Sequence, residues 1–231
     1  MKVSAIICPI RIQKIKTSHL IQKIMKMKNT FLMFSCILFT LLFLVSGVGA
    51  DDSELCRKGN LEVCTRLCDG GYTKDCNFLG LSYFLGEGIK QDYFKAFEFF
   101  SKACDGEVAA GCSMLGGMYY NGKGIKQDYF KAYEVYKKSC DLGYADGCCA
   151  LGFMYGLGQG IKQDYLKAFE FSSKACDGDV ASCCSMLGAM YHSGEGVKKD
   201  IAKEKEFFGK ACDLKDQAGC EGYAKLNSQG K

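Results

Sequence analysis

Apolar positions follow helical spacing in short segments along most of the chain. In residues 111–121 they fall at i, i+3, i+4 and i+7, which marks one face of an α-helix: Cys112, Leu115, Gly116 and Tyr119. Gly122-Lys123-Gly124 ends this segment, because glycine accepts a positive φ. Asp128 then stands where an N-cap would begin a second helix, which runs to about Cys140. The pattern therefore predicts a pair of helices.

This helix pair recurs with a period of 36 residues. Two cysteine series show the period, one at Cys68, Cys104, Cys140, Cys176 and Cys212, the other at Cys76, Cys112, Cys148, Cys184 and Cys220. A Lys-Ala pair also recurs at 95–96, 131–132 and 167–168, and Lys203-Glu204 replaces it in the last unit. Self-similarity at this period predicts an all-α protein, a right-handed α/α solenoid without β-sheet.

Three further series have simple physical roles. They are Gly80, Gly116, Gly152 and Gly188; Tyr83, Tyr119, Tyr155 and Tyr191; and Asp92, Asp128, Asp164 and Asp200. The glycines fall in mid-helix, where glycine costs about 1 kcal/mol relative to alanine, so we expect close backbone contact between paired helices there. The tyrosines are expected to fill the core one turn later, and the aspartates to cap the second helices.

The spacing of the cysteines constrains how they pair. Two residues eight apart on one helix are about 12 Å apart along its axis, whereas a disulfide needs Cα atoms within about 7 Å. Cys140 and Cys148 therefore pair only if the chain reverses at 142–146. A bridge closing so short a loop contributes roughly 2–3 kcal/mol on the chain-entropy model. We predict Cys68–Cys76, Cys104–Cys112, Cys140–Cys148, Cys176–Cys184 and Cys212–Cys220.

The remaining cysteines of residues 51–231 are less regularly spaced. Cys56 and Cys64 are also eight apart, and we expect them to bridge a shortened N-terminal cap. Cys149 and Cys183 break the pattern, because they take the places of Ser113 and Gly111 on first helices of neighbouring units. They either meet between stacked helices or stay as two buried thiols. The sequence thus divides into a leader (1–50), an N-terminal cap (51–67), four repeats (68–220) and a C-terminal cap and tail (221–231).

The leader has the features of a secretory signal peptide. An apolar run at 31–48 follows Lys26 and Lys28 and ends in Val48-Gly49-Ala50, which favours cleavage after Ala50. An uncleaved anchor is the alternative, because the run approaches the length of a short membrane span. Residues 1–24 lengthen the basic region, so either the true start is Met25 or Met27 or the leader is unusually long. We expect a secreted or periplasmic protein.

The composition of residues 51–231 argues against several functional classes of protein. Residues 1–50 hold seven of the 30 Lys and Arg and no acid, which leaves 23 basic and 26 acidic residues and no electrostatic footprint for nucleic acid. Fourteen cysteines remain in 181 residues, a density that indicates a disulfide framework. A metal-thiolate site favours cysteines two to four apart with histidines, and only His192 remains. The recurrent G-x-G follows a helix and not a strand, so it is no dinucleotide site. We therefore predict neither a metal nor a cofactor.

The motif L-G-x-x-Y-x-x-G-x-G-[IV]-x-x-D-x-x-K-A in 36-residue units resembles the Sel-one-like repeat, a relative of the tetratricopeptide repeat. With the added cysteine pairs, residues 65–224 are similar to the Helicobacter cysteine-rich proteins, which are secreted and disulfide-bridged. That resemblance implies penicillin binding, weak β-lactamase activity or host interaction. It supplies no catalytic residue to carry over.

The residues themselves give little support for β-lactamase chemistry. Ser228-Gln229-Gly230-Lys231 matches Ser-x-x-Lys, but it lies at the C-terminus without the S-D-N and K-T-G elements of a serine β-lactamase. A Ser-His-Asp triad would have to use His192 as its base. A solvent-facing position is the plainer interpretation of His192, which replaces Phe84, Tyr120 and Gly156 of the other units.

A ligand site is expected where the first helices vary beside their packing stripe. First helices of solenoids usually line the concave face, and we predict a groove formed by Asn77, Ser113, Tyr120, Asn121, Ser185 and His192. Hydroxyls, amides and rings suit an extended peptide. We therefore predict a monomeric envelope protein that binds peptides, cell-wall fragments or β-lactam-like ligands, with weak penicillin hydrolysis implied by the resemblance. The alternative is a non-enzymatic module for host or envelope protein partners.

Overall fold

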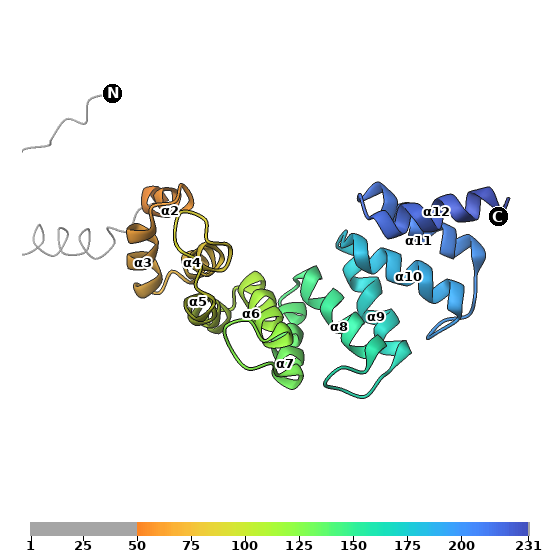
Figure 1. Ribbon diagram of the computed structural model, residues 1–231, viewed down its shortest axis with the longest axis horizontal. Helices are drawn as coiled ribbons and strands as arrows, with labels where there is room; N and C mark the ends of the chain where they lie inside the picture. Colours follow the sequence, from red (N-terminus) through yellow and green to blue (C-terminus); the bar gives the residue numbers. More distant parts are fainter. Residues whose placement is uncertain (1–49, 231) are drawn as a thin grey trace, which may run out of the picture. The chain divides into compact units, whose positions relative to one another are not determined.

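The computed structural model describes residues 50–230, and all regular structure in that range is α-helical (Figure 1). The helices are α2 (Ala50–Arg57), α3 (Leu61–Asp69), α4 (Thr73–Leu85), α5 (Tyr93–Asp105), α6 (Ala109–Asn121), α7 (Tyr129–Asp141), α8 (Ala145–Leu157), α9 (Tyr165–Asp177), α10 (Ala181–Ser193), α11 (Ile201–Asp213) and α12 (Gln217–Ser228). None of them is both long and apolar enough to cross a membrane. The signal peptide expected in residues 1–50 lies outside the described residues, except for Ala50.

Four helix pairs follow one another in chain order: α4–α5, α6–α7, α8–α9 and α10–α11. Each helix packs against the next, and the first helices of successive pairs also touch, as α6 does with both α4 and α8. Helix α12 packs on α11 and α10, in the place that a fifth first helix would take. The prediction of an all-α solenoid of 36-residue repeats is confirmed.

The helix boundaries follow from the residues that the sequence repeats. Asp128 caps α7 by accepting a hydrogen bond from the backbone N–H of Lys131 at 3.0 Å, and Asp92, Asp164 and Asp200 cap α5, α9 and α11 in the same way. Gly122 ends α6 with a φ of 67°, a left-handed conformation that glycine adopts without strain. Because these capping residues act on their own neighbours, the helix boundaries could be predicted from the sequence.

The glycines in mid-helix allow close packing, as the sequence predicted. A Cβ added to Gly116 would lie 2.7 Å from two ring carbons of Tyr136 on the paired helix, closer than such atoms can approach. The other three glycines face the equivalent residues of their own pairs: Phe100, Ser172 and Phe208. The missing Cβ therefore lets each second helix place a side chain directly on the backbone of the first.

The repeated tyrosines and lysines interact across each pair. Tyr155 and Tyr191 are buried, as predicted, while Tyr83 and Tyr119 are only half-buried. A lysine twelve residues later lies over each ring, with its Nζ 5.1–5.5 Å from the ring centroid: Lys95, Lys131, Lys167 and Lys203. Such cation–π contacts contribute about 0.5–1 kcal/mol each at exposed sites. The alanine that follows the lysine in the first three pairs is fully buried, so both halves of the Lys-Ala motif have a packing role.

Six disulfides join cysteines eight residues apart, as predicted, with Cα–Cα distances of 4.4–4.8 Å. Four of them link the end of a second helix to the start of the helix that follows it. In the cap, Cys68–Cys76 joins α3 to α4 and Cys56–Cys64 joins α2 to α3. Cys149 and Cys183 also pair, with a Cα–Cα distance of 5.7 Å, and this bridge links α8 to α10. Disulfides at this density are typical of proteins in an oxidising, extracytoplasmic compartment.

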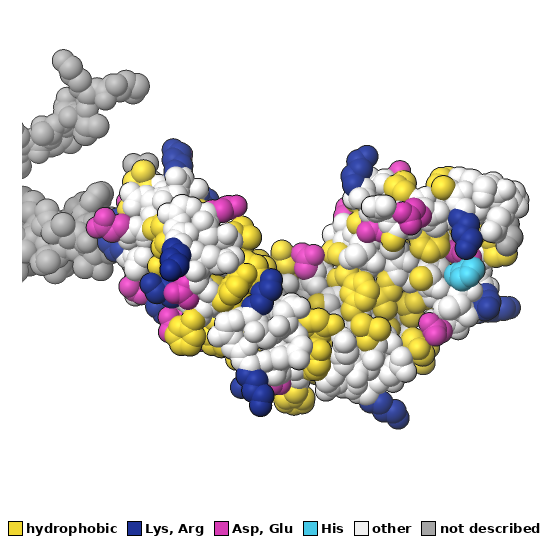
Figure 2. Space-filling model, in the orientation of Figure 1, with side chains coloured by type: hydrophobic (Ala, Val, Ile, Leu, Met, Phe, Trp, Pro, Cys, Tyr) yellow, Lys and Arg dark blue, Asp and Glu magenta, His cyan; other side chains and the backbone are white. Residues whose placement is uncertain are grey.

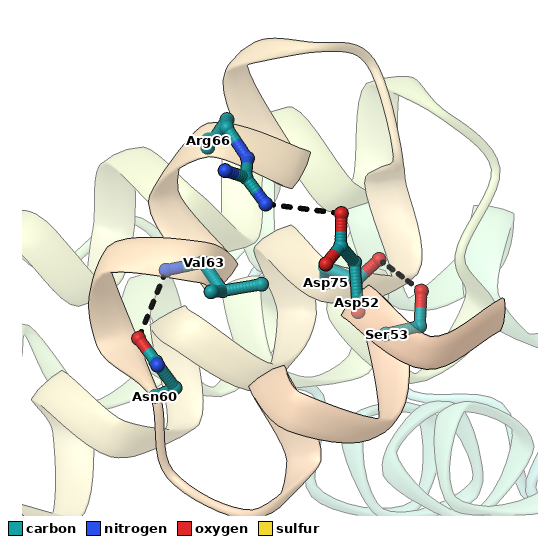
Figure 3. A network of polar contacts seen from close by, with 6 residues as sticks. All are labelled: Asp52, Ser53, Asn60, Val63, Arg66 and Asp75. Atoms are coloured by element: carbon teal, nitrogen blue, oxygen red, sulfur yellow. Dashed lines mark hydrogen bonds and ion pairs between the residues drawn. The ribbon is translucent and has the colours of Figure 1, made fainter. Parts of the chain in front are cut away.

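Polar contacts join the helices of the N-terminal cap to each other and to the first pair (Figure 3). Arg66 on α3 forms an ion pair with Asp52 on α2 at 3.0 Å. Ser53 donates a hydrogen bond at 3.3 Å to the carboxylate of Asp75, which is buried on α4. Asn60 caps α3 by accepting from the backbone N–H of Val63. The contact between Ser53 and Asp75 thus links the cap to α4, and the other two contacts hold the cap itself together.

Candidate functional site

The first helices expose one face that the packing between pairs does not use. On α4 and α8 this face carries large apolar side chains, whose exposed fractions are 37% for Leu81, 48% for Leu85, 37% for Phe153 and 61% for Leu157. The equivalent residues of α6 and α10 are small or polar: Gly117, Asn121, Ala189 and Ser193. Figure 2 shows hydrophobic side chains gathered in the region of α8 and α10. We call these eight positions the outer face of the first helices.

Three of the six predicted groove residues lie at the seam between successive first helices. Asn77 approaches Gly111 of the next first helix, where an added Cβ would be 3.3 Å from its Oδ1. That Oδ1 is buried without a hydrogen-bond partner in the described residues. Ser185 donates a hydrogen bond to Asp216 at the start of α12. Cys149 belongs to the same series and is bonded to Cys183. The third residue, Ser113, is half-buried.

The other three predicted residues lie in the last turns of α6 and α10, where Asn121 and His192 are exposed and Tyr120 is half-buried. The hydroxyl of Tyr120 donates to the side-chain carbonyl of Gln159 in the loop of the next pair. Asn121 belongs to the outer face, and its amide donates at 2.8 Å to the carbonyl of Gly117. His192 is far along the chain on α10, and 69% of its side chain is exposed. Tyr120 and Asn121 are thus consecutive residues of α6 with different partners, whereas His192 lies on α10, two first helices further along the chain.

His192 has a partner that the sequence analysis did not identify as a site residue. Its Nδ1 lies 2.9 Å from Oε1 of Glu204 on α11, and only 6% of the Glu204 side chain is exposed. Both residues line a cleft of about 850 Å³ between α10, α11 and α12. Glu204 stands where Ala96, Ala132 and Ala168 are buried in the other pairs. The break in the Lys-Ala motif was therefore the sequence signal for this site.

The chemistry available in this cleft is limited. A histidine and a buried carboxylate form two parts of a Ser-His-acid triad, but no serine is among the residues that line the cleft. Ser228 donates its hydroxyl hydrogen to the carbonyl of Lys225, and Lys231, the end of the Ser-x-x-Lys match, lies outside the described residues. Within residues 50–230 no group of three His, Cys, Asp or Glu side chains is arranged to hold a metal.

Comparison with protein families identifies a repeat. The model of the Sel1 repeat matches residues 74–107, 109–144, 145–180 and 181–216. Each match covers one helix pair, from the start of the first helix to just beyond the end of the second. Comparison with curated proteins gives no match.

Solved structures include similar repeat proteins. A protective antigen of uropathogenic Escherichia coli strains, described as displaying an SLR fold, is 30% identical over 74% of this chain, with a TM-score of 0.70; the chain spans 36% of that antigen's length. A Sel1 repeat protein from Oxalobacter formigenes is 23% identical over 74% of this chain and 77% of its own length, with a TM-score of 0.66. Cysteine rich protein B of Helicobacter pylori is 31% identical over 60% of this chain and 98% of its own length, with a TM-score of 0.46.

Proposed function

The chain belongs to the Sel1 repeat family, and on that premise we propose that it is an extracytoplasmic interaction module that binds extended peptide segments on the outer face of its first helices. The observation that supports this most is the exposure of Leu81, Leu85, Phe153 and Leu157 on that face. Large apolar side chains that are exposed on one face are typical of protein-binding surfaces. Solenoids commonly bind partners along such surfaces.

The arrangement of the outer face suits a peptide better than a small rigid ligand. Its apolar positions on α4 and α8 are separated by the small and polar positions of α6, Gly117 and Asn121. An extended segment can place side chains on two separated apolar positions and its backbone over the polar one between them. We further propose that the protein is secreted or periplasmic and acts as a monomer.

Cell-wall peptides and β-lactams are the narrower class of ligand that the resemblance implies. The His192–Glu204 pair is the one observation that favours hydrolysis of such ligands, and the absence of serine from the lining of that cleft weighs against it. We therefore place binding to a protein segment first and weak penicillin hydrolysis second.

Selection from a library of displayed peptides tests the proposed surface. We expect peptides selected on the oxidised protein to lose at least tenfold in affinity for the double variant Phe153→Ser with Leu157→Ser, because truncating central apolar anchors costs about 2 kcal/mol or more. The matched control is Phe94→Ser with Phe130→Ser, which removes two side chains that are 60% exposed on the second helices. Affinities are measured by calorimetry.

Two results would count against the proposal. The first is peptides that bind both double variants as well as the unchanged protein. The second is a larger loss for the control pair on α5 and α7, which would move the site to the second helices. A chromogenic β-lactam added to the same proteins addresses hydrolysis, and turnover that disappears in His192→Tyr would place the hydrolytic function first.

A further inference from the structure

The cleft at the C-terminal end combines two departures from the repeat in direct contact. His192 takes the place of Phe84, Tyr120 and Gly156, and Glu204 takes the place of a fully buried alanine. In the earlier pairs the next unit covers the first of these positions. Lys123 lies over the ring of Phe84 at 5.0 Å, and the hydroxyl of Tyr120 donates to Gln159.

The residue equivalent to Lys123 and Gln159 at the His192 position is Lys231, which lies outside the described residues. In the third pair the methyl group of Met186, on the next first helix, lies 3.0 Å from where a Cβ on Gly156 would be. The residue equivalent to Met186 on α12 is Gly222, which has no side chain and fits closely against the ring of Phe208. Among the described residues, Gly222 therefore leaves free the space that Met186 fills in the third pair, and Gly222 and His192 both line the cleft of about 850 Å³.

The buried carboxylate of Glu204 defines the chemistry of the cleft. An ionised carboxylate accepts hydrogen bonds only, so Nδ1 of His192 is the donor across the 2.9 Å contact. With Nδ1 as the donor, the imidazole supplies one hydrogen bond to the carboxylate, and Nε2 is the second position at which the ring can exchange a hydrogen bond with a ligand. Burial of a charge is costly unless an opposite charge accompanies it. The site is therefore more complete with a cation than without one.

The walls of the cleft fit the long stem of a basic side chain. Phe208, Leu226 and Ala189 line it with apolar surface, and Asp200 adds a second carboxylate. Arginine and lysine bury their methylene stems on apolar surface while the charged head group reaches a polar partner. Lys199 and Lys225 also line the cleft, but both are exposed to solvent, where their repulsion of a bound cation is screened by salt.

We propose that this cleft binds an arginine or lysine side chain of a peptide segment, with the head group hydrogen-bonded to Glu204 and to Nε2 of His192. The inference rests on the proposed peptide-binding function and gives it a preference for a basic residue at the C-terminal end of the surface. Arginine suits the site best, because its planar guanidinium donates to two acceptors at once.

Nuclear magnetic resonance of the His192 ring tests the assignment. His192→Tyr, which introduces the type of residue found at 120, identifies the ring signals of His192 by their loss. The oxidised protein is then titrated with three blocked tripeptides, Ala-X-Ala, where X is arginine, citrulline or glutamate. We expect a saturable shift of the His192 signals with arginine and at least about tenfold weaker binding of citrulline, because a hydrogen bond to a charged group is worth about that much. Glutamate should leave the signals unchanged.

The variant Glu204→Ala restores the residue of the other three pairs, so we expect it to fold, which circular dichroism and thermal unfolding verify. It should weaken the arginine peptide at least tenfold. The proposal is overturned if Glu204→Ala binds the arginine peptide unchanged, if citrulline equals arginine, or if the glutamate peptide binds best, which would make the cleft an anion site formed by Lys199 and Lys225.

This experiment is separable from the test of the outer face. Phe153→Ser with Leu157→Ser should leave the binding of the arginine tripeptide within about twofold, since neither residue lines the cleft. If the library peptides lose affinity for the Phe153→Ser, Leu157→Ser variant but the His192 signals do not respond to the arginine tripeptide, only the proposed binding in the cleft is refuted. If the library peptides keep their affinity for that variant and the His192 signals respond to arginine, peptide binding on the outer face is refuted and binding in the cleft is retained.

Discussion

At the scale of single residues, the repeated positions are explained by what each one touches. Gly116 and Gly117 are neighbours on α6 but differ in surroundings. A Cβ on Gly116 would overlap the ring of Tyr136 at 2.7 Å, whereas a Cβ on Gly117 would lie 3.5 Å from the hydroxyl of the same residue, which is ordinary contact. Only the first glycine belongs to the 36-residue series. The series therefore marks a packing requirement.

These two glycines give a matched prediction. Gly117→Ala should raise the free energy of unfolding by about 0.5–1 kcal/mol, because alanine loses less backbone freedom than glycine in a helix. Gly116→Ala should lower it by about 1–2 kcal/mol, because overpacking costs more than the helix gains. Unfolding in guanidinium chloride measures both. Changes of the same sign in the two variants would contradict the packing explanation.

The buried carboxylate is the other feature that belongs to this scale. Glu204 replaces an alanine that is fully buried in three pairs, yet it is accommodated because His192 changed at the position that it contacts. Neither substitution alone indicates a site. A glutamate buried without the imidazole would lack its hydrogen bond, and a histidine at 192 without the glutamate would be one more exposed side chain.

At the scale of elements, two kinds of disulfide have different effects. The bridges between cysteines eight apart fix the turn between consecutive helices. Cys149–Cys183 spans 34 residues and joins α8 to α10, the first helices of neighbouring pairs. It is the only bridge among the described residues that fixes one pair directly to the next through their first helices. Separation of those pairs would have to break it.

Removal of the Cys149–Cys183 bridge should therefore lower the free energy of unfolding more than removal of a bridge between cysteines eight residues apart. Cys149→Ser with Cys183→Gly installs residue types found at the same positions of other pairs and should lower the free energy of unfolding by up to about 4 kcal/mol on the chain-entropy model. Cys104→Ala with Cys112→Ala, the control, should cost about 2.5 kcal/mol on the same model. Denaturant unfolding of the two double variants makes the comparison. An equal or smaller loss for the Cys149 and Cys183 variant would show that the bridge closes on a contact already rigid without it.

At the scale of the whole molecule, aromatic contacts run from one helix pair to the next. The rings of Phe97 and Tyr119 meet edge to face at 5.5 Å, those of Tyr133 and Tyr155 at 5.9 Å, and those of Phe169 and Tyr191 at 5.7 Å. Each contact joins a second helix to the first helix of the next pair. Because each repeat contacts mainly its neighbours, the stability of the described part is a sum of such nearest-neighbour terms.

One of these contacts predicts how the stability depends on pH. Burial, followed by the hydrogen bond with Tyr133, raises the pKa of Tyr155 to about 12. Below pH 10 the phenol is neutral in both states and its contribution is fully present. Above pH 10 the unfolded chain loses the proton while the folded protein retains it, so the free energy of unfolding falls as pH rises towards 12.

Denaturant unfolding between pH 9 and 12 measures this decline, with Tyr155→Phe as the comparison. The variant should show a shallower decline, because phenylalanine has no proton to lose, even though it also lacks the hydrogen bond at neutral pH. Burial also raises the pKa of Tyr136, so a residual slope is expected. Identical slopes in the two proteins would show that Tyr155 does not couple folding to alkaline pH.

A structural feature could be predicted from the sequence when the residues that determine it lie close together in the chain. Helix boundaries depend on caps such as Asp128 and Gly122, which act on their own neighbours, and the short disulfides depend on a turn of a few residues. Both were therefore predictable. The disulfide between Cys149 and Cys183 was left open, because their pairing depends on how two first helices separated by a whole repeat face each other.

The ligand surface depended most on tertiary structure. The sequence by itself determined the helix pairs, the 36-residue solenoid and the disulfides between cysteines eight residues apart. It could do so because the same capping, packing and turn residues recur in each of the four repeats. It did not separate the seam residues Asn77 and Ser185 from the exposed Asn121, since all of them vary beside the packing stripe. Only the packing of α10 against α11 showed that His192 contacts Glu204, because that contact joins side chains on two different helices and both residues depart from the repeat.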